Sequence, residues 1–181
     1  MSLPTLRGRT CLLRELRVED AAALQRHADD PAVARNLLEA FPQPYMLSDA
    51  QAWCGGQWRM GGKVWGIEAK GEIQGQVIGC IGLRAEEGWL RCNAEAGYWI
   101  GQAFWRRGIV SEALRLVTDW AWREQPQITR IYAPIFRWNE GSMAVAKASG
   151  YELESRLPRS AYKDGQLIDR VVFASYRTMP Q

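Results

Sequence analysis

One short stretch constrains the fold of this chain more than any other, and it runs from Tyr98 to Ala113. It begins as an apolar strand, passes through the basic turn Arg106-Arg107-Gly108, and continues with apolar residues at helical spacing. The amides that open a helix have no partners within it and carry the positive end of the helix dipole. With two arginines beside them, these amides predict a binding site for a phosphate or pyrophosphate group.

Two widespread phosphate-binding motifs do not account for this turn. A P-loop requires Gly-Lys followed by Ser or Thr, and the chain has no such tripeptide. A dinucleotide-binding fold requires Gly-x-Gly-x-x-Gly after its first strand, whereas this turn has one central glycine and follows the fourth predicted strand. On these residues alone, a plain strand-to-helix connection with solvated arginines stays open as the alternative.

A second segment, from Ile135 to Tyr151, has the pattern of a strand end, a turn and a helix. Asn139 is a residue type that caps the amino end of a helix, and Gly150 is one that ends it. Ser142 falls in the first turn, near the open end of this helix. By itself, the segment favours a capping role for Asn139 and Ser142 and nothing more.

Taken together and in this order, the two segments resemble the signatures of the GNAT N-acetyltransferases. Gly97–Ile100 and the turn after it resemble the acyl-CoA loop of that family, and Asn139–Gly150 resembles its second signature. Leu13–Ala28 and the segment around Tyr162 look like the RimJ/RimL-type branch. The resemblance implies a mixed α/β (α+β) fold with a central sheet of about six to seven strands and flanking helices.

The resemblance also implies acetyl-CoA as the co-substrate. In the family, the pantetheine arm pairs like an extra strand with the strand before the loop, and backbone amides of the loop take the pyrophosphate. Val110 stands where the family usually has Gly or Ala, so we expect it to narrow the approach slightly. The implied cofactor-binding residues are Tyr98, Trp99, Ile100, Arg106, Arg107, Gly108, Ile109, Val110, Ser111, Asn139 and Ser142.

Acetyl transfer to an amine requires one group that removes a proton from the amine and another that protonates the CoA thiolate. Many family members use a tyrosine seven residues after the asparagine for the second step, but that position is Ala146 here. The RimL-like pattern has serine at the position of Ser142, and we assign the acid role to Ser142, directly or through water. A simple first-turn serine is the alternative.

The base is less well defined by the sequence. A carboxylate proposed for the RimL type aligns with Ala161 and is missing here. In other branches a glutamate early in the pantetheine strand acts through water, and Glu95 matches that position. Strand alternation places Glu95 on the same face as Gly97 and Trp99. A catalytic Glu95 and a Glu95 that only pairs with an arginine or with solvent both stay open.

Composition and charge exclude several classes of partner. The formal net charge is +3 and the arginines are scattered along the chain, so we expect no nucleic-acid partner. Cys11, Cys54, Cys80 and Cys92 show no C-x-x-C spacing, and His27 is the one histidine, so we expect no metal site. With no long apolar run and no recognisable signal peptide, we expect no membrane association and a reducing, cytoplasmic location.

We expect residues 1–181 to form a single GNAT domain. Pro31–Leu38 predicts a short helix, and a capping box at Ser48–Gln51 predicts another that runs to about Met60. We expect the acceptor pocket to be formed around Phe41–Met60 and the turn at Tyr162.

The acceptor itself stays open between a protein N-terminal amine, as in the RimJ/RimL type, and a small-molecule amine. A non-catalytic acyl-CoA-binding or regulatory module is the alternative function, supported by the alanines at Ala146 and Ala161. The oligomeric state is also open, a homodimer included.

Overall fold

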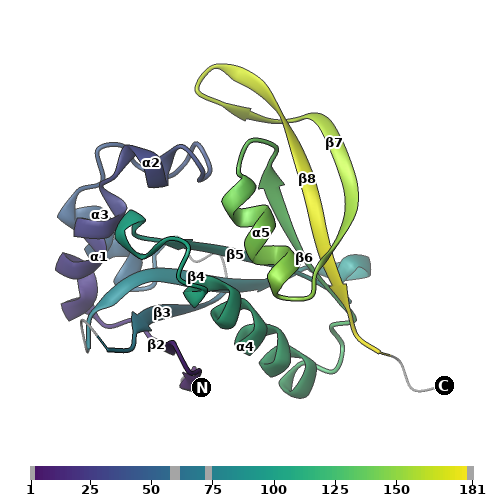
Figure 1. Ribbon diagram of the computed structural model, residues 1–181, viewed down its shortest axis with the longest axis horizontal. Coiled ribbons are helices and arrows are strands. Elements are labelled where there is room, and N and C mark those ends of the chain that lie inside the picture. The colour runs from purple at the N-terminus through teal and green to yellow at the C-terminus, as the bar shows by residue number, and fades with distance from the viewer. Residues whose placement is uncertain (1–2, 58–61, 72–74, 179–181) are drawn as a thin grey trace.

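The computed structural model describes residues 3–57, 62–71 and 75–178, whose strands form one mixed sheet (Figure 1). The strands are β1 (Leu6–Arg7), β2 (Cys11–Glu15), β3 (Lys63–Ala69), β4 (Val77–Ala85), β5 (Asn93–Ile100), β6 (Arg130–Phe136), β7 (Glu152–Lys163) and β8 (Gln166–Tyr176). These eight strands lie in the order β1-β2-β3-β4-β5-β6-β8-β7. Neighbouring strands are antiparallel except β5 and β6, which run parallel. The predicted mixed α/β fold is confirmed. The expected count of about six to seven strands was too low, because β1 has two residues and gives no alternating pattern.

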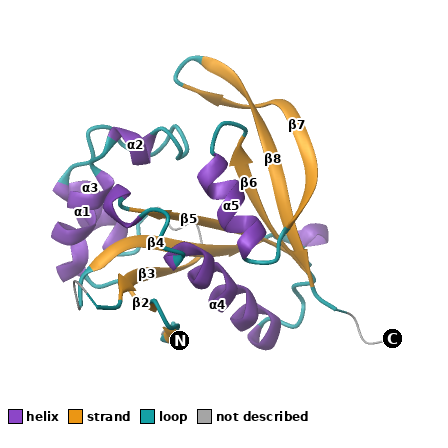
Figure 2. Cartoon of the chain, viewed as in Figure 1, coloured by secondary structure: helices purple, strands orange, loops and turns teal. Residues whose placement is uncertain are grey.

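Strands and helices are interspersed along the chain (Figure 2). The α-helices are α1 (Ala21–Ala28), α2 (Pro31–Ala34), α3 (Leu47–Cys54), α4 (Ile109–Glu124) and α5 (Glu140–Ala148). Short 3-10 helices are η1 (Val18–Asp20), η2 (Gly88–Leu90) and η3 (Gln102–Phe104). Within the described residues, no helix is long and apolar enough to cross a membrane.

Two apolar cores stabilise the two faces of the sheet. The larger core packs α4 against one face and includes Trp65 and Leu114, both fully buried. The smaller core packs α1 and α3 against the other face and includes Leu24 and Val77. Side chains alternate across β5, so Ile100 belongs to the larger core while Trp99 packs against the smaller one.

Helix α4 forms directly after the predicted phosphate loop because its sequence is amphipathic and well bounded. Buried residues recur at helical spacing along its inner face, among them Ile109, Ala113, Val117 and Trp120. The helix ends at Glu124, and a proline follows shortly after, a residue that cannot continue a helix. The loop is therefore attached to a rigid element that is anchored in the main core.

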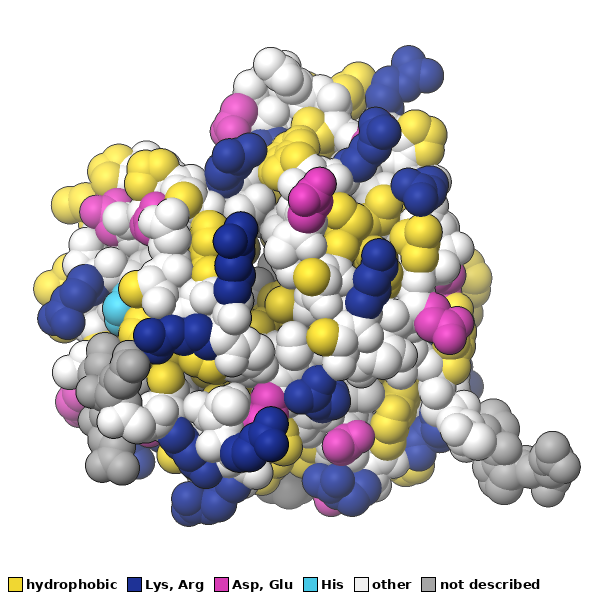
Figure 3. Space-filling model, in the orientation of Figure 1, with side chains coloured by type: hydrophobic (Ala, Val, Ile, Leu, Met, Phe, Trp, Pro, Cys, Tyr) yellow, Lys and Arg dark blue, Asp and Glu magenta, His cyan; other side chains and the backbone are white. Residues whose placement is uncertain are grey.

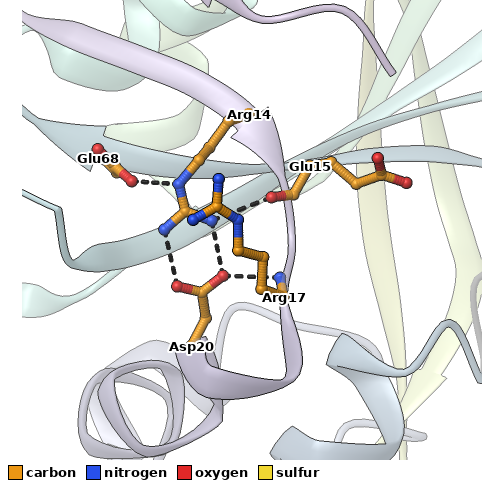
Figure 4. Close-up of polar contacts among 5 residues, drawn as sticks. All are labelled: Arg14, Glu15, Arg17, Asp20 and Glu68. Atoms are coloured by element: carbon orange, nitrogen blue, oxygen red, sulfur yellow. Dashed lines mark hydrogen bonds and ion pairs between the residues drawn. The ribbon is translucent and has the colours of Figure 1, made fainter. Parts of the chain in front are cut away.

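A buried ion cluster fixes the start of α1 to the sheet (Figure 4). The guanidinium of Arg14 on β2 makes two 2.7 Å bonds to the carboxylate of Asp20. It also donates through Nε to Glu68 on β3. The backbone amide of Arg17 donates to Asp20 at 2.8 Å, which closes the turn before the helix. This cluster joins two strands and one helix start through a single side chain.

The capping box predicted at Ser48–Gln51 is wrong. The residue that caps helix α3 is Met46, two residues earlier than the predicted Ser48. The carboxylate of Asp49 accepts a 2.8 Å hydrogen bond from the Met46 amide, so the acidic residue in the first turn satisfies the free amide before the helix. The predicted end of this helix, near Met60, lies outside the described residues.

Candidate active site

A cleft of about 840 Å³ lies where the carboxyl end of β5, the loop after it, the α2 segment and the first turn of α5 meet. Figure 1 shows α2 and α5 on opposite sides of this region. The space-filling view shows Lys and Arg side chains beside apolar surface on the face that α4 and α5 occupy (Figure 3). The predicted cofactor residues that line the cleft are Tyr98, Trp99, Ile100, Arg106, Arg107, Gly108, Ile109, Val110, Ser111, Asn139 and Ser142.

The cleft begins where two parallel strands separate. Strands β5 and β6 are paired at three positions, from Asn93 with Arg130 to Glu95 with Tyr132. Beyond Glu95, the described residues of β5 have no pairing with β6, so this edge of β5 is free to bond an extended ligand. One of its carbonyl groups is already used, because the indole N–H of Trp105 donates to the Ile100 carbonyl at 2.9 Å.

The opposite edge of the same stretch of β5 is held very close to β4. A Cβ atom built on Gly79 would lie 2.3 Å from the carbonyl oxygen of Trp99. Any other residue at position 79 would therefore push the end of β5 away. This glycine fixes the position of the strand edge that borders the cleft.

The loop that follows β5 has the backbone geometry of an anion site. Arg106 has a φ of 61°, a left-handed conformation that is uncommon for a residue other than glycine, and Gly108 has a φ of 73°. Left-handed residues in such a turn direct successive amides to one side, and the first amides of α4 follow directly. The guanidinium of Arg107 lies 5.6 Å from the ring centre of Phe104. Val110 is a buried member of the main core.

The second signature segment forms the opposite wall. The Asn139 side chain accepts a 3.0 Å hydrogen bond from the Ser142 amide, so it caps α5 as predicted. The Ser142 hydroxyl donates to the hydroxyl of Tyr98 at 3.0 Å. The Tyr98 hydroxyl in turn donates to the Ser142 carbonyl at 3.2 Å. Burial raises the pKa of Tyr98 to about 12, although the hydrogen bond from Ser142 by itself lowers this pKa.

Glu95, the predicted base, is not among the residues that line the cleft within the described part of the chain. Its carboxylate accepts a 2.8 Å hydrogen bond from Arg84 on β4. Pairing with an arginine is the alternative role of Glu95 that the sequence left open. Arg84 also lies 3.8 Å from Glu86, and the hydroxyl of Tyr132 donates to Glu86. Two carboxylates and one guanidinium give this cluster a net negative charge.

The sheet surface between Glu95 and Trp99 is open. Gly97 lies between them on the same face and is exposed, although β5 is an interior strand. A Cβ atom built on Gly97 would meet no other atom within 4 Å. The far end of this face is bounded by aromatic rings, since Trp99 contacts Phe41 edge-on and Phe41 stacks on Tyr45.

Sequence reasoning missed two parts of the cleft. The α2 segment lines it from Ala32 to Leu37, yet these residues carry no motif, and α2 itself is shorter than the predicted helix over Pro31–Leu38. The hydroxyl of Tyr98 was also missed, because only its backbone was expected to contact the cofactor. The turn at Tyr162 is exposed and does not line this cleft within the described residues.

The family model described as an acetyltransferase (GNAT) domain matches residues 11–152, a range that contains both signature segments. The chain belongs to this family. It is therefore related to enzymes that transfer acetyl groups, as the resemblance predicted.

Relatives and solved structures support the RimJ/RimL-like branch of this GNAT enzyme. An uncharacterised N-acetyltransferase of Bacillus subtilis, YoaA, is 28% identical over 175 residues, which are 94% of this chain and 96% of YoaA. RimJ of Mycobacterium smegmatis, solved with a CoA disulfide, is 25% identical with a TM-score of 0.79 over 96% of this chain and 86% of RimJ. RimL in complex with coenzyme A shares the fold, with 21% identity and a TM-score of 0.81 over 96% of this chain and 98% of RimL.

Proposed function

We propose that this protein binds acetyl-CoA in the cleft and transfers the acetyl group to a primary amine. The observation that carries the proposal is that both signature segments line one cleft, with left-handed Arg106 and Gly108 at its amide-rich end. The CoA ligands named for the RimL and RimJ structures support the same cofactor. No metal is invoked, because a thioester is activated enough to react with an amine.

In this proposal the cofactor lies along the free edge of β5. The pantetheine arm bonds to the backbone of Tyr98–Ile100, and the pyrophosphate lies on the amides of Arg106–Ser111. The side chains of Arg106 and Arg107 add positive charge near the same phosphates. Asn139 holds the first turn of α5 in place, which brings Ser142 to the sulfur end of the cofactor.

Replacement of Gly108 by valine tests this binding mode. Valine does not adopt a φ of 73° readily, and a side chain here would cover the amides, so CoA affinity should fall more than about tenfold, roughly 1.4 kcal/mol. The matched control is Gly150→Val, because Gly150 has a φ of 83° and lies outside the cleft lining. Isothermal titration of CoA should show lost affinity in the first variant alone. Equal affinities in both folded variants would contradict the binding mode.

The acceptor in this proposal is a protein N-terminal amine of the type modified by RimJ and RimL. The similarity to those enzymes and the open sheet surface at Gly97 support a large substrate. Peptides that begin with Ser, Ala or Thr should therefore be acetylated faster than polyamines or amine-containing antibiotics. Faster acetylation of any small amine would move the assignment to a small-molecule acetyltransferase. We place the reaction in the cytoplasm, where the four cysteines, which form no disulfide within the described residues, stay reduced.

Acetyl transfer also needs a route for the proton of the amine. In this proposal, Glu95 relays the proton through water. The water lies on the open face of β5, next to Gly97. The bond of Glu95 to Arg84 holds the carboxylate in place but also occupies one of its oxygens. A module that binds acetyl-CoA without turnover is the competing function, favoured by this engagement of Glu95 and by the alanines at Ala146 and Ala161.

A further inference from the structure

The hydroxyl group of Tyr98 meets the first turn of α5 across the gap between β5 and β6. Its side chain extends from β5 on the face of the larger core, and it is one of the partly buried residues that pack against that core. Tyr98 and Ser142 both line the cleft, and their hydroxyl oxygens lie 3.0 Å apart. A phenol and an aliphatic hydroxyl therefore meet at the place where the sulfur of the cofactor is expected.

The tyrosine that other family members carry on this helix has no counterpart on α5. Ala146 takes its position and is fully buried in the main core. The phenol that reaches the first turn of α5 comes instead from β5, the fifth strand in the order of the sheet. The same chemical group thus enters the cleft from a different element.

We propose that Tyr98, rather than Ser142 alone, gives up the proton that converts the leaving CoA thiolate to a thiol, with Ser142 as the residue that orients and supports it. This inference rests on the proposed acetyltransferase function and names the donor group within it. A phenol is the better donor, because even with its pKa raised to about 12 by burial, Tyr98 is a far stronger acid than an aliphatic hydroxyl.

The directions of the hydrogen bonds agree with this division of roles. The proton of Ser142 is directed to the Tyr98 oxygen, so it supports negative charge that develops there. The proton of Tyr98 is held by a 3.2 Å bond to the Ser142 carbonyl, longer than the usual O–H···O distance of about 2.7–2.8 Å. A thiolate that arrives beside Tyr98 is a charged and stronger acceptor than that carbonyl.

The step balances as follows. The amine nitrogen forms a bond to the acetyl carbon, the carbon–sulfur bond breaks, and its electron pair leaves with the sulfur. The hydroxyl proton of Tyr98 passes to the sulfur, and the hydrogen bond from Ser142 stabilises the phenolate that results. The amine releases one proton to solvent and Tyr98 recovers one from solvent, so Tyr98 is restored after each turnover.

Removal of single hydroxyl groups tests this assignment. Tyr98→Phe keeps the ring and should lower kcat about 10²-fold, while the KM for acetyl-CoA stays within about twofold. Ser142→Ala keeps the donor and removes its support, so kcat should fall only about tenfold. The double variant should be no slower than Tyr98→Phe, because both hydroxyls act in one step.

Tyr151→Phe is the matched control. Tyr151 is also buried and bonds another hydroxyl, that of Thr118 at 2.7 Å, but it does not line the cleft. This variant loses a comparable phenol–hydroxyl bond, and its kcat should stay within about twofold of wild type. A kcat for Tyr98→Phe within twofold of wild type would overturn the proposal. A loss of 10²-fold or more in Ser142→Ala would also overturn it, and that result stands even if Tyr98→Phe does not fold.

A second measurement does not depend on any acceptor. If Tyr98 donates to the sulfur, it stabilises the thiolate, so the thiol pKa of bound CoA should be about one pH unit lower in wild type than in Tyr98→Phe. Ultraviolet absorbance of the thiolate during a pH titration measures this pKa. Equal values in the two complexes would overturn the role of Tyr98 while leaving acetyl-CoA binding intact. Failure of wild-type protein to bind CoA would instead overturn the proposed function itself.

Discussion

Two arginine–carboxylate clusters lie on the same face of the sheet, and they differ chiefly in burial. The register of β2 to β5 places Arg14 and Arg84 on this shared face. The side chains of Arg14 and Asp20 are only 11% and 9% exposed, beside the smaller core (Figure 4). The side chains of Arg84 and Glu95 are 41% and 30% exposed. The same pair of chemical groups is thus part of the scaffold in one place and accessible to solvent in the other.

This difference shows what each cluster can contribute. A buried guanidinium that satisfies two carboxylates stabilises the fold mainly because its loss would leave those charges unpaired and without water. An exposed pair is screened and contributes little to stability, so its carboxylate can exchange partners at small cost. Glu95 can therefore exchange its bond to Arg84 for one to water at smaller cost than Asp20 can exchange its bonds to Arg14.

The largest expected effect follows from replacement of Arg14 by methionine. Asp20 and Glu68 would then remain buried without the guanidinium that bonds to both, and the free energy of unfolding should fall by about 3–5 kcal/mol. Urea denaturation monitored by tryptophan fluorescence measures this change. A loss below about 1 kcal/mol would place the buried cluster in the same class as the exposed one.

The pH dependence of this variant gives a separate check. Burial alone raises the pKa of Asp20, but hydrogen bonds from Arg14 and Arg17 outweigh it and hold that pKa below its ordinary value. A lowered folded-state pKa contributes stability above the unfolded-state pKa of about 4, and this contribution is lost as the pH falls. The stability difference between wild type and Arg14→Met should therefore shrink below about pH 4. A difference that stays constant into acid would contradict the pairing.

An intermediate effect is expected for Glu95→Gln, which keeps the shape and removes the basicity. If Glu95 relays the proton of the amine, the rate should fall about tenfold at neutral pH and recover as the pH rises, because more of the amine is then already deprotonated. CoA affinity should be unchanged, since the cofactor contacts proposed on β5 are backbone ones. A wild-type pH–rate profile would leave Glu95 as an ion-pair partner only, with the proton released directly to water.

The smallest effect is expected for Arg84→Met, the matched counterpart of Arg14→Met. The exposed pair with Glu95 should contribute less than about 1 kcal/mol to the free energy of unfolding. The same urea denaturation measures it. A loss as large as that of Arg14→Met would show that the second cluster is also structural and would weaken the case for a proton relay through Glu95.

The parts of the molecule that the sequence predicted well depend on local patterns. The turn at Gly108 and the cap at Asn139 are set by neighbours within one turn. The predicted cofactor residues line one cleft, and their role in binding the cofactor stays a prediction. The hydrogen bonds from Ser142 to Tyr98 and from Arg84 to Glu95 depend on which helices and strands lie side by side, and on strand register. The residue pattern of one segment shows neither which elements lie beside it nor the register of its pairing.

The short elements also could not be predicted from sequence patterns. Strand β1 and helix α2 span only about one period of their type, which is too short for a recurring pattern. Helix α3 begins after Met46, because the Met46 amide donates to the carboxylate of Asp49. The acceptor pocket predicted around Phe41–Met60 includes residues outside the described ranges and stays a prediction. The single-domain assignment of residues 1–181 likewise stays a prediction.

The most direct test of the proposed activity is release of free CoA thiol from acetyl-CoA in the presence of an amine. Purified protein would be mixed with acetyl-CoA and a peptide that begins with Ser, Ala or Thr, with a thiol reagent to follow the reaction and mass spectrometry to detect the acetylated peptide. We predict thiol release that requires the peptide, matches the acetylated product in amount, and is strongly reduced in Gly108→Val. Tight binding of acetyl-CoA without amine-dependent thiol release, across peptides and small amines alike, would contradict the proposed activity and favour a non-catalytic acyl-CoA-binding module.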